Sequence, residues 1–181
     1  MNFPYFLLLT LFLTTVSADD CSPIDKPKHV KCLKLFNDIR ETSVEASAKM
    51  KDSIVYKGCL EYPKCVSVLT CKADKDVISA VDKMSAFCQV TIFRESPEFA
   101  DCDAKLDPNK SICVKEWKPF PEPVEDPVKM AEIQKEACKN NFGKDNCMEK
   151  VIRDNCGAEM WKKFKEYLLT SNKLDGACDF D

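Results

Sequence analysis

The 12 cysteines of this chain are the side chains with the most chemistry to offer, because thiolates bind zinc, act as nucleophiles or pair as disulfides. Their positions are Cys21, Cys32, Cys59, Cys65, Cys71, Cys88, Cys102, Cys113, Cys138, Cys147, Cys156 and Cys178. The closest neighbours, Cys59, Cys65 and Cys71, are still six positions apart, whereas zinc sites are built on tighter pairs. The even count therefore predicts disulfides with no free thiol and no metal site.

The N-terminal residues predict the compartment. Residues 1–18 hold no charged side chain and carry an apolar run from Phe6 to Leu13, followed by small residues before Asp19. The run is too short for a membrane span of roughly 20 residues, so we interpret it as a secretory signal peptide. The mature chain, residues 19–181, is expected to be secreted and extracellular, without a membrane span.

The sequence contains no recognisable catalytic set. The single histidine, His29, lies among lysines in KPKHVKC and is expected to be a solvated surface residue rather than a general base. No Gly-x-Ser-x-Gly elbow occurs, and the pairs Asp101 with Asp103 and Glu122 with Glu125 are typical of any acidic surface. We therefore expect a protein that is not an enzyme and that uses no cofactor.

Two further motifs concern the surface. Asn109, Lys110 and Ser111 form an Asn-x-Ser sequon in a polar turn, which predicts glycosylation at Asn109; the alternative is an unmodified turn. The basic residues of KKFK at 162–165 are interpreted as a solvated helix face rather than a site for anionic glycans or lipid headgroups. The net charge of −3 does not favour nucleic acid as a partner.

The elements that position these residues are expected to be helices. Only four glycines occur, which is few for a β-rich chain, and Cys32, Leu35, Phe36 and Ile39 recur at helical spacing. The fold class is therefore predicted as mainly α, a disulfide-cross-braced domain of about six or seven helices. The predicted helices are about 28–50, 58–72, 75–93, 97–106, 127–142, 145–156 and 158–170. Residues 111–117 are expected to be extended.

A proline-rich segment divides this helical domain. Residues 118–127, KPFPEPVEDP, contain four prolines and are expected to form an extended connector. It separates subdomains at 19–117 and 128–181, with eight and four cysteines. Because both counts are even, each part could close its own bridges.

The helix predicted at 145–156 illustrates the bracing. At about 100° per residue, the nine positions from Cys147 to Cys156 bring the second cysteine half a turn round the helix. The two sulfurs then face opposite sides and can be bonded to two different neighbours. Gly157 is expected to end this helix, and Trp161 and Phe164 belong to the apolar face of the next one.

Three short motifs are similar to those of a known protein family. They are CLKLF at 32–36, WKPF at 117–120, and Cys156-Gly157 followed by Trp161 and Phe164. With a leading signal peptide and about twelve cysteines, the chain resembles a nematode-expanded family of secreted cysteine-rich domains, domain of unknown function nineteen. The resemblance implies a helical, disulfide-bonded extracellular domain. It implies no activity and no catalytic residues.

Two functions stay open. The first is a non-enzymatic interaction module that binds an extracellular protein or glycan through a rigid surface. The second is a carrier of small apolar ligands or lipids, since braced helical folds can enclose a cavity. Its lining would come from Phe36, Phe87, Phe93, Phe99, Trp117 and Trp161. An ordinary core made of these aromatic residues is the simpler interpretation.

Overall fold

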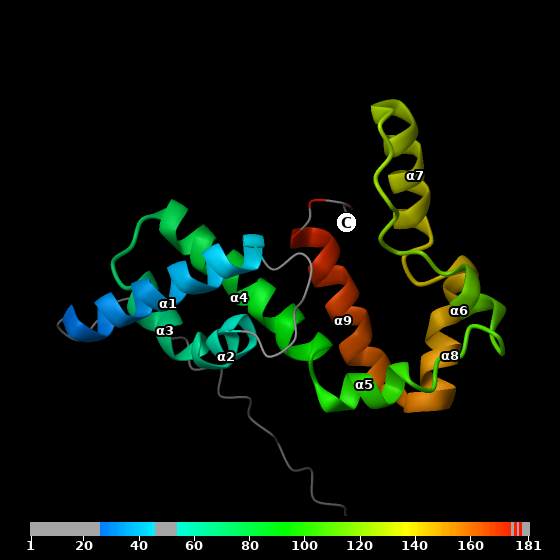
Figure 1. The fold of residues 1–181 in the computed structure, drawn as a ribbon, viewed down its shortest axis with the longest axis horizontal. Coiled ribbons are helices and arrows are strands. Elements are labelled where there is room, and N and C mark those ends of the chain that lie inside the picture. The colour runs from blue at the N-terminus through cyan, green and yellow to red at the C-terminus, as the bar shows by residue number, and fades with distance from the viewer. Residues whose placement is uncertain (1–25, 46–53, 175, 177, 179–181) are drawn as a thin grey trace, which may run out of the picture.

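The computed structural model describes residues 26–45, 54–174, 176 and 178, and the described residues form helices and loops without a strand (Figure 1). The predicted fold class, a mainly α domain cross-braced by disulfides, is confirmed. The described chain contains nine α-helices and a 3₁₀-helix, more than the six or seven expected. Their bounds are α1 Lys26–Glu45, α2 Ile54–Glu61, α3 Pro63–Thr70, α4 Lys75–Arg94, α5 Pro97–Asp103, α6 Ile112–Glu116, α7 Pro127–Lys139, η1 Lys144–Asn146, α8 Cys147–Cys156 and α9 Ala158–Leu174.

The first core lies between α1, α2, α3 and the N-terminal part of α4. Ile39, Val55 and Tyr62 are fully buried there. Two disulfides cross this core: Cys32–Cys65 joins α1 to α3, and Cys59–Cys88 joins α2 to α4. Cys71 is also disulfide-bonded, while Cys21 lies outside the described residues.

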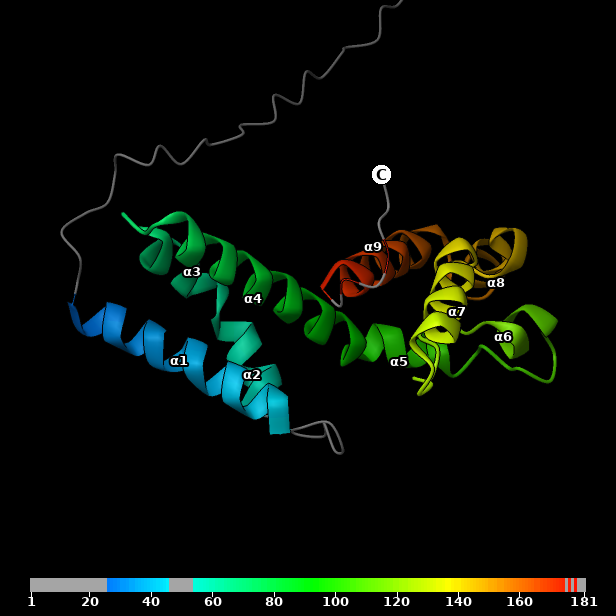
Figure 2. The same ribbon diagram turned by 90° about the horizontal axis from the view of Figure 1, so that it is seen from above.

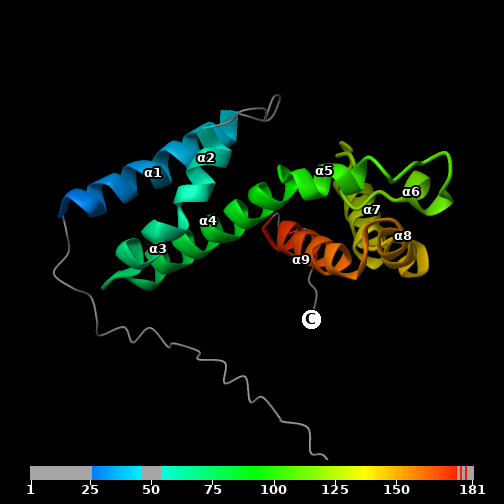
Figure 3. The same cartoon turned by 90° about the horizontal axis from the view of Figure 1, so that it is seen from below.

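The second core is built by α5, α6, α8, α9 and the C-terminal end of α4. Met148, Ile152 and Leu168 are fully buried in it, and aromatic rings surround them. The helix α4 serves both cores, because its Val81 packs in the first and its Phe93 against the second. Figures 2 and 3 show α4 running from the first group of helices to α5 and α9.

Helix α8 is bonded at both ends, as its cysteine spacing predicted. Cys147 at its start bonds Cys113 of α6, and Cys156 at its end bonds Cys102 of α5. Gly157 ends the helix with φ of 92°. These bridges join residues on opposite sides of the connector, so the expectation that each part closes its own bridges is wrong.

Several predicted elements differ from the structure, and among them α5 ends at Asp103 rather than at 106 while α9 reaches Leu174 rather than 170. The helix expected at 58–72 is divided into α2 and α3, because Pro63 has no backbone N–H to continue the first helix. Residues 111–117 are not extended: Ser111 caps a short helix, its Oγ accepting a hydrogen bond from the Val114 N–H. Helix α7 ends three residues before its predicted limit of 142, because Asn140 leaves the helical conformation. Among the described helices, none has the length and apolarity needed to cross a membrane.

Candidate interaction surface

The connector spans residues 118–126 rather than 118–127, because Pro127 begins α7, and Trp117 anchors its start. The indole Nε1–H donates a hydrogen bond to the Asn141 carbonyl oxygen at 2.9 Å, and the ring lies 5.5 Å from that of Phe164. Pro119, two residues after Trp117, is buried. An extended segment of this kind, with prolines that restrict φ, leaves the second core in a defined direction.

Helix α7 follows the connector and projects from the body of the molecule (Figure 1). Asp126 caps it, its Oδ1 accepting from the Val128 and Lys129 backbone N–H groups at 2.9 and 3.2 Å, and Pro127 takes the first helical position. No residue of α7 is buried. We call the connector together with α7, residues 118–139, the arm.

Apolar side chains and two hollows mark the arm. Phe120 is 45% exposed and Val128 is 69% exposed. One hollow, of about 550 Å³, lies between the connector and α7, with Met130 in its lining. A second, of about 580 Å³, lies between α6, α7 and the connector, with Trp117 in its lining. Pro121 lines both, so the connector forms a ridge between them.

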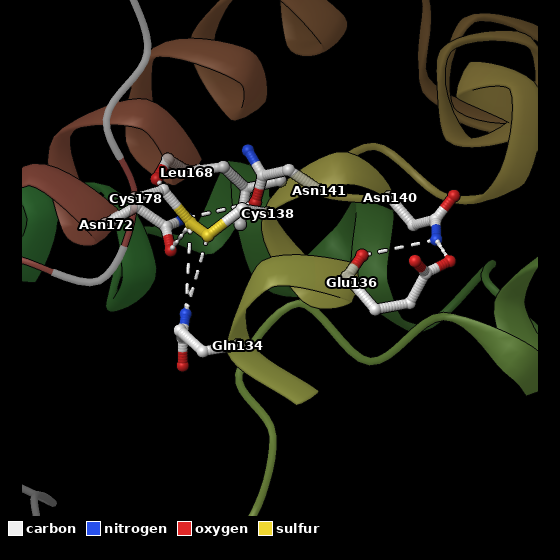
Figure 4. The surroundings of a disulfide bond; sticks show 8 residues. All are labelled: Gln134, Glu136, Cys138, Asn140, Asn141, Leu168, Asn172 and Cys178. Atoms are coloured by element: carbon white, nitrogen blue, oxygen red, sulfur yellow. Dashed lines mark hydrogen bonds between the residues drawn. A yellow bond between two sulfur atoms is a disulfide. The ribbon is translucent and has the colours of Figure 1, made fainter. Parts of the chain in front are cut away.

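A disulfide and a buried amide network fix the base of the arm (Figure 4). Cys138 of α7 bonds Cys178, and the Gln134 amide lies 3.6 and 3.8 Å from the two sulfurs. Asn172 of α9, fully buried, donates hydrogen bonds to Asn141 Oδ1 at 2.9 Å and to a carbonyl of its own helix. The end of the arm is therefore bonded to Cys178 beyond α9, and Asn141 just after the arm is hydrogen-bonded to α9, although the arm packs little against any described helix.

The aromatic residues proposed to line a carrier cavity are divided between the two cores. Phe36 and Phe87 pack against the first core, whereas the other four belong to the second. In the second core the rings contact one another, with centroids 5.0 Å apart for Phe93 and Phe99. They fill a core rather than surround one cavity.

The other candidate residues do not converge on a site. His29 is half-buried rather than solvated, because it lies on α1 with its Nδ1 shielded from solvent. The lysines of KKFK point apart: Lys163 pairs with Glu98 at 2.7 Å, while Lys165 lies 5.8 Å above the Phe142 ring. In the described ranges, no group of three or more His, Cys, Asp or Glu side chains is placed to hold a metal ion.

Asn109 lies where the sequence placed it, exposed in the turn between α5 and α6. Its backbone N–H donates to Asp107 Oδ1 at 2.8 Å, and this bond, assisted by Lys110, holds the pKa of the Asp107 carboxyl below its usual range. The Asp107 side chain is therefore an ionised acceptor for this hydrogen bond at neutral pH.

Comparison with known proteins identifies the family to which this chain is similar. Residues 21–179 match the family described as "Domain of unknown function (DUF19)". The Caenorhabditis elegans protein "Excretory canal abnormal exc-13" is 33% identical over 178 residues, covering 93% of this chain and 87% of the relative. Two UPF0376 proteins of the same worm, F10G2.1 and C36C5.12, are 27% and 29% identical, covering 91% and 82% of this chain and 85% and 71% of the relatives. No solved structure matches.

Proposed function

This chain belongs to the DUF19 family, and on that premise we propose that it is an exported, non-enzymatic interaction module whose arm binds another extracellular protein. The observation that carries the proposal is the arm itself. Helix α7 has no buried residue, and the arm exposes Phe120 of the connector and Val128 of α7 beside two hollows, which leaves apolar surface uncovered. Uncovered apolar surface with a polar rim is typical of protein interfaces.

A protein partner suits this surface better than a glycan. The lining of the hollow beside α7 is mostly apolar, with Pro119, Phe120, Pro127 and Met130, and it offers few hydrogen-bond donors for sugar hydroxyls. Apolar side chains of a partner can fill this hollow and exclude water. The bridge Cys138–Cys178 keeps the arm ordered before binding, which lowers the entropic cost of association.

Export is supported by two features of the chain. The predicted signal peptide at 1–18 lies outside the described residues and stays a prediction. Five disulfides lie within the described part, and such bonds persist in oxidising compartments outside the cytosol.

The test compares two double variants at exposed apolar positions. Phe120→Ser with Val128→Ser alters the arm, and Val30→Ser with Ile54→Ser alters two positions of 66% exposure in the first group of helices. Saturable binding of the labelled protein to extracellular proteins of its source organism is measured for each. We expect the arm variant to lose at least about tenfold in affinity and the control to bind normally. Equal effects of the two variants would contradict the proposal.

The carrier function has a separate test. The natively purified protein is extracted with organic solvent, and the extract is analysed for lipids by mass spectrometry. A stoichiometric apolar ligand would favour the carrier function, whereas an empty extract is expected for an interaction module with filled cores.

A further inference from the structure

Asn109 heads the one Asn-x-Ser/Thr sequon of the 181-residue sequence. It is exposed in the turn that follows α5, and Pro108 before it does not interrupt the sequon. In Figures 1 and 2 the loop between α5 and α6 lies at the outer edge of the second group of helices, away from the free end of α7. A bulky group attached to Asn109 would therefore extend into solvent without overlapping the second core or the arm.

The folded turn already uses the polar groups of the sequon. The Asp107 carbonyl oxygen accepts hydrogen bonds from the backbone N–H groups of Lys110 and Ser111, at 3.0 and 3.1 Å. The Asn109 N–H is bonded to the Asp107 carboxylate, and the Ser111 hydroxyl oxygen accepts from the Val114 N–H. A transferase that reads the asparagine and the hydroxyl together must therefore bind this segment in another conformation.

A disulfide closes the same segment. Cys113, two residues after Ser111, bonds Cys147 at the start of α8 and fixes α6 in place. Once this bridge has formed, opening the turn also requires displacing α6 within a closed loop. The segment is most accessible to an enzyme before the bridge exists.

We propose that Asn109 carries an N-linked glycan, and that the glycan is attached before the α5–α6 turn and the Cys113–Cys147 bridge close. The inference rests on the proposed export, because the donor is a lipid diphosphate-linked oligosaccharide of the secretory pathway. In the transfer, Asn109 Nδ2 forms a bond to C1 of the first sugar and loses a proton. The bond from C1 to the diphosphate oxygen breaks, and the lipid diphosphate leaves with the electron pair.

The first experiment tests the modification. The full chain is expressed in a eukaryotic secretory host, and the secreted protein is weighed before and after an amidase that releases N-linked glycans. We expect a mass loss and conversion of residue 109 to Asp, with no loss for Asn109→Gln or Ser111→Ala. A secreted but unmodified chain would overturn this inference alone, whereas a chain retained in the cytosol would overturn the export on which both proposals rest.

The second experiment tests the order of events. The protein is first produced in cells whose glycosylation is blocked. It is then prepared in two forms, one oxidised and folded and the other reduced and alkylated. Each form is incubated with a microsomal transferase and its lipid-linked donor. The reduced chain is expected to accept the glycan at least tenfold faster than the folded chain, and Asn109→Gln is expected to accept none. Equal rates for the two forms would overturn the proposed order, and no transfer to either would overturn the assignment of Asn109.

Discussion

Gly143 and Gly157 have nearly the same backbone conformation in different surroundings. Their φ and ψ values are 78° and 166° for Gly143, and 92° and 167° for Gly157, a region that is essentially restricted to glycine. A Cβ added at Gly143 would lie 2.7 Å from Cys147 Sγ, whereas one added at Gly157 meets no atom within 4 Å. Of these two residues, only Gly143 must lack a side chain so that the Cys113–Cys147 disulfide can pack against its backbone.

This difference predicts unequal effects of alanine at the two positions. Gly157→Ala is expected to lower the free energy of unfolding by about 1–3 kcal/mol through backbone strain alone. Gly143→Ala is expected to cost more and to leave Cys113 and Cys147 partly unpaired. Chemical denaturation and thiol counting after oxidative refolding measure both effects. Equal losses and complete bridging in the two variants would contradict the role of Gly143.

Tyr62 predicts a dependence of stability on alkaline pH. Burial, with a smaller contribution from Asp82, raises the pKa of its phenol from 10.0 to about 12. The folded state thus holds this proton more tightly than the unfolded state. Its contribution, about 3 kcal/mol, is complete below pH 10 and is lost as the pH rises from about 10 to about 12.

The control for this prediction is Tyr62→Phe, which removes the titrating group and its 3.3 Å hydrogen bond to the Val81 carbonyl. The urea midpoint of the wild type should fall more steeply than that of the variant over this pH range. Parallel curves would mean that the Tyr62 phenol does not drive the loss.

At the scale of the elements, short helix α6 depends on its bridge. It spans only five residues and buries none of them fully, and only Cys113 and Val114 pack partly against the second core, so length and packing stabilise it weakly. Replacing Cys113 and Cys147 with Ser is expected to remove hydrogen-exchange protection from α6 while α5 keeps its protection. The matched pair Cys102→Ser with Cys156→Ser should spare α6. Protection of α6 that survives loss of its own bridge would contradict this dependence.

Local signals in the sequence predicted several elements and their limits. Gly157 ends α8 as predicted, and Ser96 and Asp126, which cap α5 and α7 before a proline, are residue types that helix starts favour. The Ser111 cap was missed because a five-residue helix has no periodic pattern to accompany it. The partners of Cys102 and Cys113 lie 54 and 34 positions away, and such pairings depend on how helices pack, which spacing does not determine. For the same reason, the sequence predicted an extended connector but not that the two parts share bridges or that α7 leaves the body.

At the scale of the whole molecule, α4 joins the two cores, so they are expected to unfold together. Ile39 and Ile152 are fully buried in the first and second core, which makes them a matched pair for substitution. Each Ile→Ala variant is expected to lose about 2–5 kcal/mol and to lower one shared thermal transition. Two transitions, each shifted by only one variant, would show that the cores unfold independently.

Site-specific cross-linking shows directly whether the arm contacts a partner protein. A photoreactive amino acid is placed at Phe120 in one protein and at Ile54 in another, and both are exposed to extracellular proteins of the source organism. We expect a discrete cross-linked protein from position 120, which excess unlabelled wild type abolishes and excess Phe120→Ser/Val128→Ser does not. A competed cross-link from position 54 with none from 120, or equal competition by the arm variant, would contradict the claim that the arm binds the partner.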